Sequence, residues 1–149
     1  MRPVEQLINE VRLLYQSLVQ IGEAIHADSK VSMGMRAVLE YLDRNGDATV
    51  PHIARARRVT RQRIQTLVNP LLAMGLAESI SNPASKRSPL ITLTTTGTKT
   101  ILEMRRREGR QMQLAMSETK ILQAAQTLSE LRRGLEEGAL DKDRSSVGG

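Results

Sequence analysis

The chain has 149 residues, of which 40% are hydrophobic and 1% aromatic, and its formal net charge is +6. The absence of cysteine excludes a disulfide scaffold, a thiolate metal site and a cysteine redox sensor. No apolar run approaches the ~18 residues of a membrane span. The chain opens with an amphipathic stretch containing Glu5 and Glu10 rather than a signal peptide, so we expect a cytoplasmic protein without membrane contact.

The positive charge is concentrated between residues 51 and 89. This stretch contains seven basic side chains and one acid, Glu78, whereas acids and bases balance in the rest of the chain. Either the stretch is a solvated basic face or it binds a polyanion, and charge segregated so completely favours the polyanion.

Apolar residues at intervals of three and four predict helices along most of the chain. In chain order, these helices cover residues 4–26, 32–44, 51–57, 60–74, 95–116 and 117–135. Four hydroxyl side chains are suited to cap a helix by accepting a backbone N–H, namely Ser32, Thr49, Thr60 and Thr94. Glycines at 46 and 75 end two helices, because glycine adopts the left-handed conformation that is usual there.

Two short runs of β type, 76–81 and 90–94, stand between the fourth and fifth helices. The segment that joins them is basic and rich in turn residues, so the pair predicts a β-hairpin with a long tip. Residues 138–149 are expected to form a disordered tail.

The predicted fold class is mainly α (α+β), with a winged helix-turn-helix domain at residues 31–94 that carries a two-stranded β-wing. Residues 4–30 and 95–137 form the second predicted region, which is helical. Its apolar stripes exceed what so small a middle domain can cover, which predicts dimerisation with a second copy.

The helix-turn-helix over residues 51–74 carries the predicted DNA-reading side chains. In this motif the start of the second helix enters the major groove, where Arg pairs with guanine and Gln with adenine. The predicted contacts are Thr60, Arg61, Gln62, Arg63, Gln65 and Thr66, with Arg55, Arg57 and Arg58 near the DNA backbone. The alternative is an ordinary antiparallel helix pair with a polar face, but no acid occurs from residue 51 to residue 77.

The hairpin tip presents Lys86 and Arg87, preceded by Ser85, between two prolines that stiffen the loop. A rigid loop that presents arginine suits a narrow minor groove, where the negative potential is enhanced. The alternative is a loop that only increases solubility. Next to the helix pair, the DNA-contacting wing is favoured.

Two stretches, "VSMGMRAVLEYLDRNGDATVPHIARARRVTRQRIQTLVNPLLAMGLAE" and "SNPASKRSPLITLTTTG", give the chain its resemblance to the MarR family of winged helix-turn-helix regulators. Leu93, Thr94 and Gly97 hold the family's Leu-Thr-x-x-Gly helix start, and Arg87 matches its wing arginine. The resemblance spans residues 5–137. It implies a homodimer that reads a near-palindromic operator, and a small-molecule effector that shifts the spacing of the two winged domains.

Three positions depart from that pattern. Ser85 stands where the family commonly has an aspartate that orients the wing, and Arg58 stands in a turn that usually contains glycine, so it is expected to adopt a positive φ. Pro70 lies inside the recognition helix, where it removes a backbone hydrogen bond to Thr66 and is expected to bend the helix.

Tyr15, His26 and Arg36 are the candidates for an effector pocket. His26, Asp28 and Ser29 are sequence neighbours without an oxyanion-hole signature, so catalysis is not expected. With two histidines and no cysteine, neither a metal site nor a cofactor is expected.

The functional hypothesis is a homodimeric, sequence-specific DNA-binding transcription regulator that acts as a repressor, with double-stranded DNA and a small-molecule effector as partners. The alternative is a winged helix that binds a protein partner or RNA. The unusual turn at Arg58 and the missing wing aspartate at residue 85 motivate that alternative.

Overall fold

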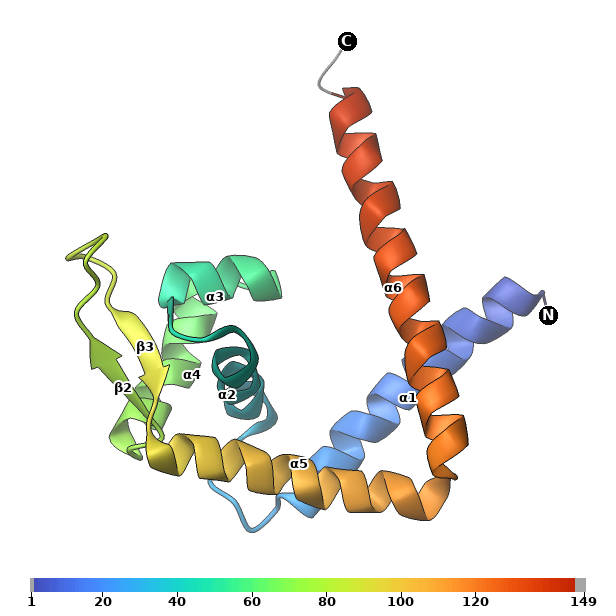
Figure 1. The fold of residues 1–149 in the computed structure, drawn as a ribbon, viewed down its shortest axis with the longest axis horizontal. Coiled ribbons are helices and arrows are strands. Elements are labelled where there is room, and N and C mark those ends of the chain that lie inside the picture. The colour runs from blue at the N-terminus through green and yellow to red at the C-terminus, as the bar shows by residue number, and fades with distance from the viewer. Residues whose placement is uncertain (1, 147–149) are drawn as a thin grey trace. The chain divides into compact units, whose positions relative to one another are not determined.

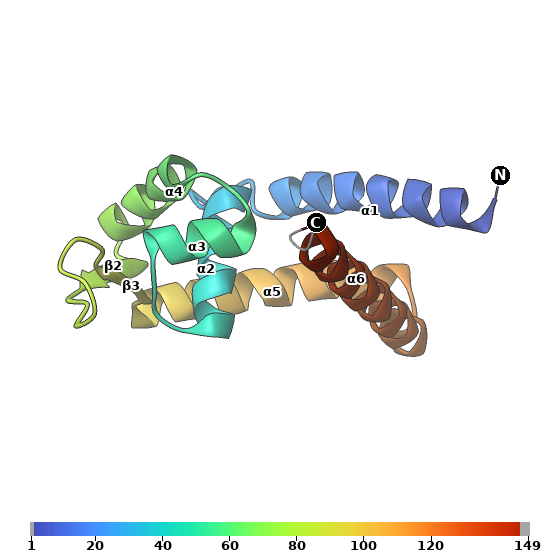
Figure 2. The same ribbon diagram turned by 90° about the horizontal axis from the view of Figure 1, so that it is seen from above.

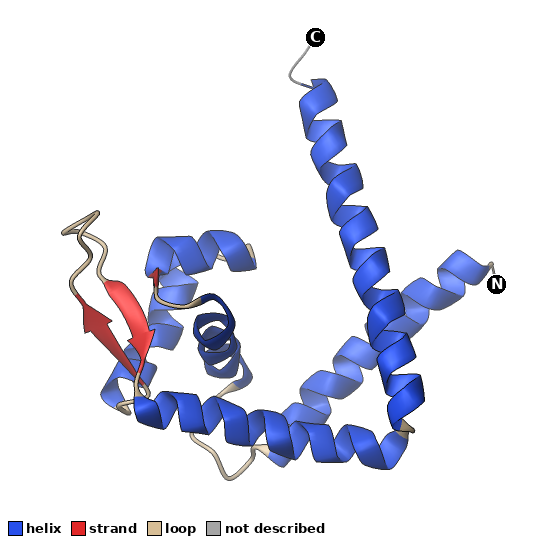
Figure 3. Cartoon of the chain, in the orientation of Figure 1, coloured by secondary structure: helices blue, strands red, loops and turns tan. Residues whose placement is uncertain are grey.

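The computed structural model describes residues 2–146, and it is mostly helical with one small sheet (Figure 1, Figure 3). The helices are α1 (Pro3–Ile25), α2 (Met33–Asn45), α3 (Val50–Arg57), α4 (Arg61–Ala73), α5 (Thr95–Ala115) and α6 (Glu118–Ser146). The strands are β1 (Ala48–Thr49), β2 (Ala77–Ile80) and β3 (Leu90–Leu93). Between residues 2 and 146, none of the helices combines the length and apolar character that crossing a bilayer requires. The predicted fold class is confirmed.

The chain divides into two compact units, residues 1–108 and 109–149. In the first unit, α2, α3 and α4 pack together beside the sheet (Figure 1, Figure 2). The predicted helical region of residues 4–30 and 95–137 is divided between the two units, because α1 and residues 95–108 of α5 cluster with the winged domain.

All four predicted N-caps are present. The hydroxyl oxygens of Ser32, Thr49, Thr60 and Thr94 accept the N–H of Met35 (3.2 Å), His52 (3.2 Å), Arg63 (3.0 Å) and Gly97 (3.0 Å), respectively. Each cap satisfies one N–H that the first helical turn leaves without an intrahelical partner. Gly46 and Gly75 have φ of 82° and 69°, as predicted for residues that follow a helix.

The predicted two-stranded wing is present as β2 and β3, and β1, which was not predicted, adds a third antiparallel strand in the order β1-β3-β2. Residues 48 and 49 pair with Ile91 and Leu90, while β2 pairs with the other edge of β3 from Ala77↔Leu93 to Ile80↔Leu90. A strand of two residues shows no alternation of apolar and polar side chains, so periodicity cannot reveal it.

The core of the winged domain is aliphatic, as the lack of aromatic residues requires. Its most buried side chains are Val38, Leu39, Ile53, Ile64, Val68, Leu71 and Ile101. They come from α2, α3, α4 and α5, which explains why the polar face of α4 points outward. By contrast, Gly22 is the one buried residue of α1.

Thr94 joins α4, the sheet and α5. Its hydroxyl group donates to the carbonyl oxygen of Gly75 (2.6 Å) while accepting the N–H of Gly97, and its own N–H donates to Leu76 (3.2 Å). A Cβ atom on Gly97 would lie 1.8 Å from the carbonyl oxygen of Leu76. Glycine at 97 therefore lets the first turn of α5 rest directly on the backbone that follows α4.

Arg105 links α5 to α2 through two side-chain hydrogen bonds. Its Nε donates to Glu40 Oε2 and its Nη1 to Asp43 Oδ2, both at 2.7 Å. Burial alone would raise the pKa of Glu40, but the hydrogen bonds from Arg105 and Arg44 outweigh it and hold that pKa below its ordinary value. Residues 105–110 form a basic run that only Glu108 and Gly109 interrupt, and Arg105 in this run faces α2 rather than solvent.

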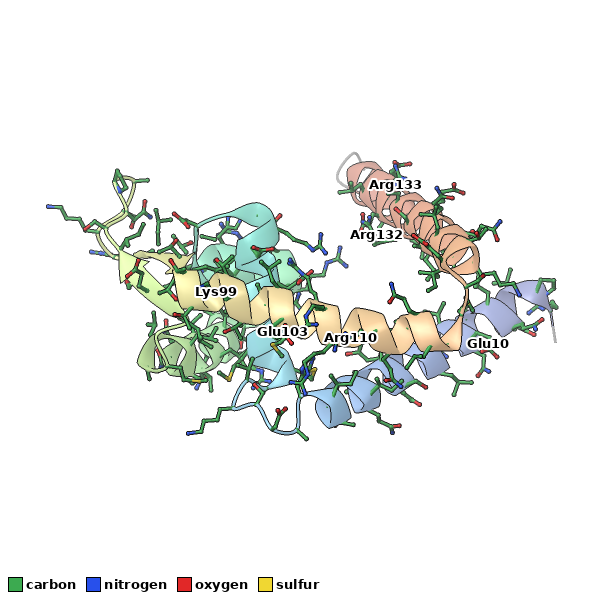
Figure 4. All side chains as sticks on the ribbon, turned by 60° about the horizontal axis from the view of Figure 1, so that its bottom comes forward. Glu10, Lys99, Glu103, Arg110, Arg132 and Arg133 are labelled. Carbon is green, nitrogen blue, oxygen red and sulfur yellow. The ribbon has the colours of Figure 1, made fainter. Side chains whose placement is uncertain are left out.

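Figure 4 shows other charged side chains spaced along α5, including Lys99, Glu103 and Arg110. Arg106 bonds Glu103 through Nε (2.8 Å) and Nη2 (2.6 Å), and both side chains are about half exposed. Neighbouring arginines on this helix therefore occupy different environments, since Arg105 turns toward α2 and Arg106 toward solvent.

The tail predicted to be disordered is helical as far as residue 146, because α6 continues through residues 138–146; residues 147–149 lie outside the described part. The prediction rested on the place of these residues at the end of the chain. A helix already formed extends at little cost through good helix formers such as Ala139, Leu140 and Lys142. Within α6, Arg132 also bonds Glu136 one turn later (3.0 Å).

Candidate nucleic-acid interface

The turn between α3 and α4 is built without glycine. Arg58 has φ 55° and ψ 43°, the left-handed conformation predicted for it. The N–H of Arg58 donates to Arg55 (3.2 Å) and that of Val59 to Ala54 (3.0 Å), so the last carbonyls of α3 are satisfied as in a Schellman motif. The left-handed conformation costs about 1–2 kcal/mol in a residue with a Cβ atom, and these hydrogen bonds offset part of that cost.

The start of α4 presents the predicted reading surface. Arg61, Gln62, Arg63, Gln65 and Thr66 are all exposed, while Ile64, Leu67, Val68 and Leu71 are buried on the opposite face. Because α4 is anchored on one side only, long hydrogen-bonding side chains stand on a fixed backbone. No acid lies among them, so nothing on α4 neutralises the arginines.

Two of these side chains already make hydrogen bonds within the helix. The Thr66 hydroxyl donates to the carbonyl oxygen of Gln62 (2.7 Å), and Gln65 Nε2 donates to Asn69 Oδ1 (2.7 Å). The Thr60 hydroxyl oxygen accepts the N–H of Arg63 as the helix cap. The predicted phosphate contacts of the two threonines therefore use atoms that also stabilise α4.

Pro70 lies in the last turn of α4, and the helix continues without interruption to Ala73. The carbonyl oxygen of Pro70 accepts the N–H of Met74 (2.9 Å). All the predicted base-reading side chains precede Pro70 by at least one turn, so the missing N–H falls behind the reading surface.

The wing tip is organised by Asn82, which sequence reasoning missed. Its Nδ2 donates to the carbonyl oxygen of Ser88 (2.9 Å), and its Oδ1 accepts the N–H of Ala84 (3.1 Å). The N–H of Ser85 donates to the Asn82 carbonyl oxygen (3.2 Å). Asn82 thus closes the loop from inside, whereas the prediction attributed the rigidity of the loop to its two prolines. The Asn-Pro pair at 82–83 was the available signal.

A concave surface of about 350 Å³ joins the recognition helix to the wing. Its lining includes Arg61, Gln62 and Gln65 from α4, and Arg87 and Ser88 from the wing. The structure therefore brings the predicted helix and wing contacts into one surface, with basic side chains on both sides of it.

Other predicted contacts lie outside that surface. Arg63 extends toward the start of α2, where its Nη2 is 3.3 Å from the position of a Cβ atom on Gly34. Lys86 is exposed at the wing tip beside a second hollow of about 470 Å³. Arg55, Arg57 and Arg58 are exposed at the end of α3, where cations also interact favourably with the helix dipole.

The predicted effector residues are only partly brought together. His26 is 3% exposed, with Nε2 3.3 Å from Glu108 Oε1, and Arg36 Nη2 donates to Glu108 Oε2 at 2.6 Å. Tyr15 is 69% exposed and stands ten residues before the end of α1, about 15 Å away along the helix. Glu108, the acid within the basic run, was the missed residue that joins His26 to Arg36.

Two shallow cavities of about 270 and 290 Å³ border His26. The larger is lined mostly by the outer face of α5, including Lys99, Thr100 and Arg107, and neither includes Tyr15 or Arg36. In the part of the chain that the structure describes, no group of three or more His, Asp or Glu side chains is placed to hold a metal ion.

Known proteins resemble the chain at two levels. A model described as "MarR family" matches residues 36–88. Proteins of Mycobacterium bovis and Mycobacterium tuberculosis, both described as uncharacterized, are 33% identical over 98 residues, which is 66% of this chain and 68% of theirs. The residues matched by the family model include the helix-turn-helix and the wing tip.

Solved structures extend the similarity to nearly the whole chain. A MarR family transcription regulator is 26% identical, with a TM-score of 0.76 over 91% of this chain and 92% of that one. A MarR family protein from Bacillus stearothermophilus is 20% identical, with a TM-score of 0.78 over 89% and 95%. BpsR of Bordetella bronchiseptica, whose DNA binding is regulated by 6-hydroxynicotinic acid, is 22% identical, with a TM-score of 0.69 over 89% and 96%.

Proposed function

Because the chain belongs to the MarR family of transcription regulators, we propose that it is a homodimeric repressor that binds a near-palindromic operator in double-stranded DNA. The observation that carries this proposal is the concave surface shared by α4 and the wing, with Arg61 on one side and Arg87 on the other. A surface with cations on both sides and no acid suits a strand of phosphates flanked by two grooves.

The roles of the side chains follow from their positions. Arg61, Gln62, Arg63 and Gln65 read base edges in the major groove, where Arg pairs with guanine and Gln with adenine. Arg87 enters the minor groove. The remaining contacts hold phosphates without reading sequence, and they are Thr60, Thr66, Ser85, Lys86, Arg55, Arg57 and Arg58.

Dimerisation is supported by apolar surface that a single chain leaves in water. On α1, Val4, Leu7, Ile8, Val11, Leu14, Leu18 and Ile21 are 38–67% exposed. On α6, Leu122, Leu128, Leu131 and Leu135 are also exposed. Helical stripes of this size are typical of a subunit interface, so we assign residues 4–30 and 95–137 to dimerisation.

A small-molecule effector is proposed to act at the junction of His26 and Arg36. These side chains meet one carboxylate, Glu108, between α1, α2 and α5, so a ligand that displaces it would loosen three helices at once. The DNA binding of BpsR responds to 6-hydroxynicotinic acid, which makes small aromatic acids the first compounds to test.

The alternative, a winged helix that binds a protein or RNA partner, was motivated by the unusual turn at Arg58 and by the missing aspartate at 85. Neither feature argues against DNA binding. The turn at Arg58 forms with its carbonyls satisfied, and Asn82 orders the wing despite serine at 85. We propose a cytoplasmic location, because the regulators that the chain resembles come from bacteria, whose DNA lies in the cytoplasm.

The proposal is tested by selecting duplexes from a random-sequence library with the purified full chain. Enrichment of a near-palindromic site is expected. Recovery of no duplex sequence, while the chain retains its helical circular dichroism, contradicts the proposal and leaves the protein- or RNA-binding alternative.

The selected site then separates the roles of the side chains. Arg63→Ala is expected to cost about 1–3 kcal/mol and to relax preference at one base position. Lys86→Ala should weaken all sequences alike and reduce the salt slope by about 1 per subunit. Arg106→Ala is the charge-matched control, because Arg106 already pairs with Glu103, and it should leave affinity unchanged. If Arg63→Ala and Lys86→Ala both match this control, the assignment of the contacts is wrong.

A further inference from the structure

Asn69 lies one helical turn after Gln65 on the exposed face of α4. Gln65 Nε2 donates to Asn69 Oδ1 at 2.7 Å, and both residues are exposed. Side chains four apart are neighbours on a helix surface, and Gln–Asn pairs at this spacing stabilise each other. Gln65 also lines the concave surface that joins α4 to the wing, whereas Asn69 does not.

We propose that Asn69 is a positioning residue that fixes the amide of Gln65 in the orientation that reads a base. This inference rests on the proposed DNA-binding function and adds a specificity-determining residue to it. Asn69 holds one amide hydrogen of Gln65 and makes no base contact itself.

The bond leaves the chemistry for base reading in place. A glutamine amide has two N–H donors and one carbonyl acceptor. With one donor held by Asn69, Gln65 retains one donor and its acceptor. That pair is the set that reads N7 and N6 of adenine in the major groove.

The bond also reduces the conformational entropy that the Gln65 side chain loses on binding DNA. A free glutamine side chain is ordered only when it meets the base, and ordering a long side chain at an interface weakens binding. A free amide can also turn over and present two donors to a base that offers acceptors, or rotate away from a wrong base. Asn69 therefore sharpens the preference for one base pair rather than adding general affinity.

One backbone hydrogen bond of α4 is missing next to this pair. Pro70 supplies no N–H to the carbonyl oxygen of Thr66, although the helix continues to Ala73. The Gln65–Asn69 bond spans the turn that precedes Pro70, and it adds a side-chain link beside the missing backbone bond.

The test measures base preference at each position of the site that the wild-type chain selects, by competition between duplexes that differ in one base pair. Gln65→Ala should flatten the preference at one base pair. Asn69→Ala should reduce the preference at that same pair by about three- to tenfold. The double variant should lose no more than Gln65→Ala alone, because Asn69 acts through Gln65.

Asn69→Asp is the matched variant that separates positioning from other effects. An aspartate keeps the acceptor for Gln65 Nε2 but adds negative charge near phosphates, so affinity should fall for all sequences while the base preference is retained. Thermal unfolding of Asn69→Ala and Asn69→Asp shows whether α4 stays intact. A role limited to helix stability would not give loss of preference in one variant and its retention in the other.

The possible results of these measurements distinguish a failure of the proposed DNA binding from a failure of the positioning role of Asn69. If no duplex is selected by the wild-type chain, the proposed function fails before Asn69 is tested. If a site is selected but Asn69→Ala keeps the wild-type preference at the pair read by Gln65, or Gln65→Ala changes no pair, the positioning role is refuted and DNA binding stands. Loss in Asn69→Ala with retention in Asn69→Asp supports it.

Discussion

Replacing Arg105 by methionine tests whether the ion pairs between α5 and α2 hold the winged domain together. Methionine keeps an apolar stem of similar length but removes both hydrogen bonds, to Glu40 and Asp43. The three side chains are 22–24% exposed, so their environment lies between the surface and the interior.

The expected loss of stability follows from that intermediate burial. Exposed ion pairs contribute about 0–1 kcal/mol, whereas removing one partner of a buried pair costs about 3–5 kcal/mol. Glu40 would keep Arg44 as a partner, which limits the damage. We therefore expect Arg105→Met to cost about 2 kcal/mol, or about 4–8 °C in Tm for a chain of this size.

Urea unfolding followed by circular dichroism, at one fixed protein concentration because dimerisation affects stability, measures this loss. Arg106→Met is the matched control one residue away, since its partner Glu103 is about half exposed, and it should cost under ~1 kcal/mol.

Lowering the pH should remove the difference in the free energy of unfolding between Arg105→Met and the wild type. The pKa of Glu40 is lowered in the folded chain from its ordinary 4.5. Its pairing therefore contributes stability above pH 4.5, and that contribution is lost as the pH falls below 4.5 and through the lowered pKa. Equal losses in the Arg105 and Arg106 variants, or an Arg105 loss that persists undiminished when the carboxylates are protonated, would refute the reasoning.

Three further substitutions test the close contact between α5 and the backbone after α4, the left-handed turn before α4, and the proline within α4. Gly97→Ala should destabilise by about 3 kcal/mol or more in thermal unfolding, because its Cβ would meet the Leu76 carbonyl oxygen at 1.8 Å; a neutral result would mean that α5 shifts freely. Arg58→Gly should raise the unfolding free energy by about 1 kcal/mol by relieving the left-handed conformation, and a loss would show that the side chain itself matters. Pro70→Ala restores an N–H for Thr66 and should raise stability by ~1 kcal/mol or more with an unchanged selected site, whereas a changed site would show that Pro70 sets how α4 enters the groove.

Features that depend on neighbouring residues were predictable from the sequence. A hydroxyl group before a helix has a backbone N–H within reach three residues later, so the caps at Ser32 and Thr60 need no knowledge of the fold. The left-handed conformation of Arg58 was expected because helix-turn-helix motifs usually have glycine in this turn. The burial of Ile64 and Leu71 followed from helical spacing.

Features that depend on distant residues were not predictable. Arg105 and Glu40 are 65 positions apart, and nothing in the basic run shows which arginine turns inward. The strand at Ala48 exists only because β3 lies beside it. Glu108 looked like an interruption of positive charge until folding placed it between His26 and Arg36.

The hydrogen bonds of Thr94, which link the end of α4 to the start of α5, have a consequence for the order of folding. Its bond to Gly75 closes a loop of 19 residues, whereas the bond between Glu40 and Arg105 spans 65. Closing the longer loop costs about 1 kcal/mol more in chain entropy. We therefore expect the hairpin, with the end of α4 and the start of α5, to form as a local nucleus before α5 docks on α2. Thr94→Val should then slow refolding more than it speeds unfolding, while Arg105→Met should do the reverse.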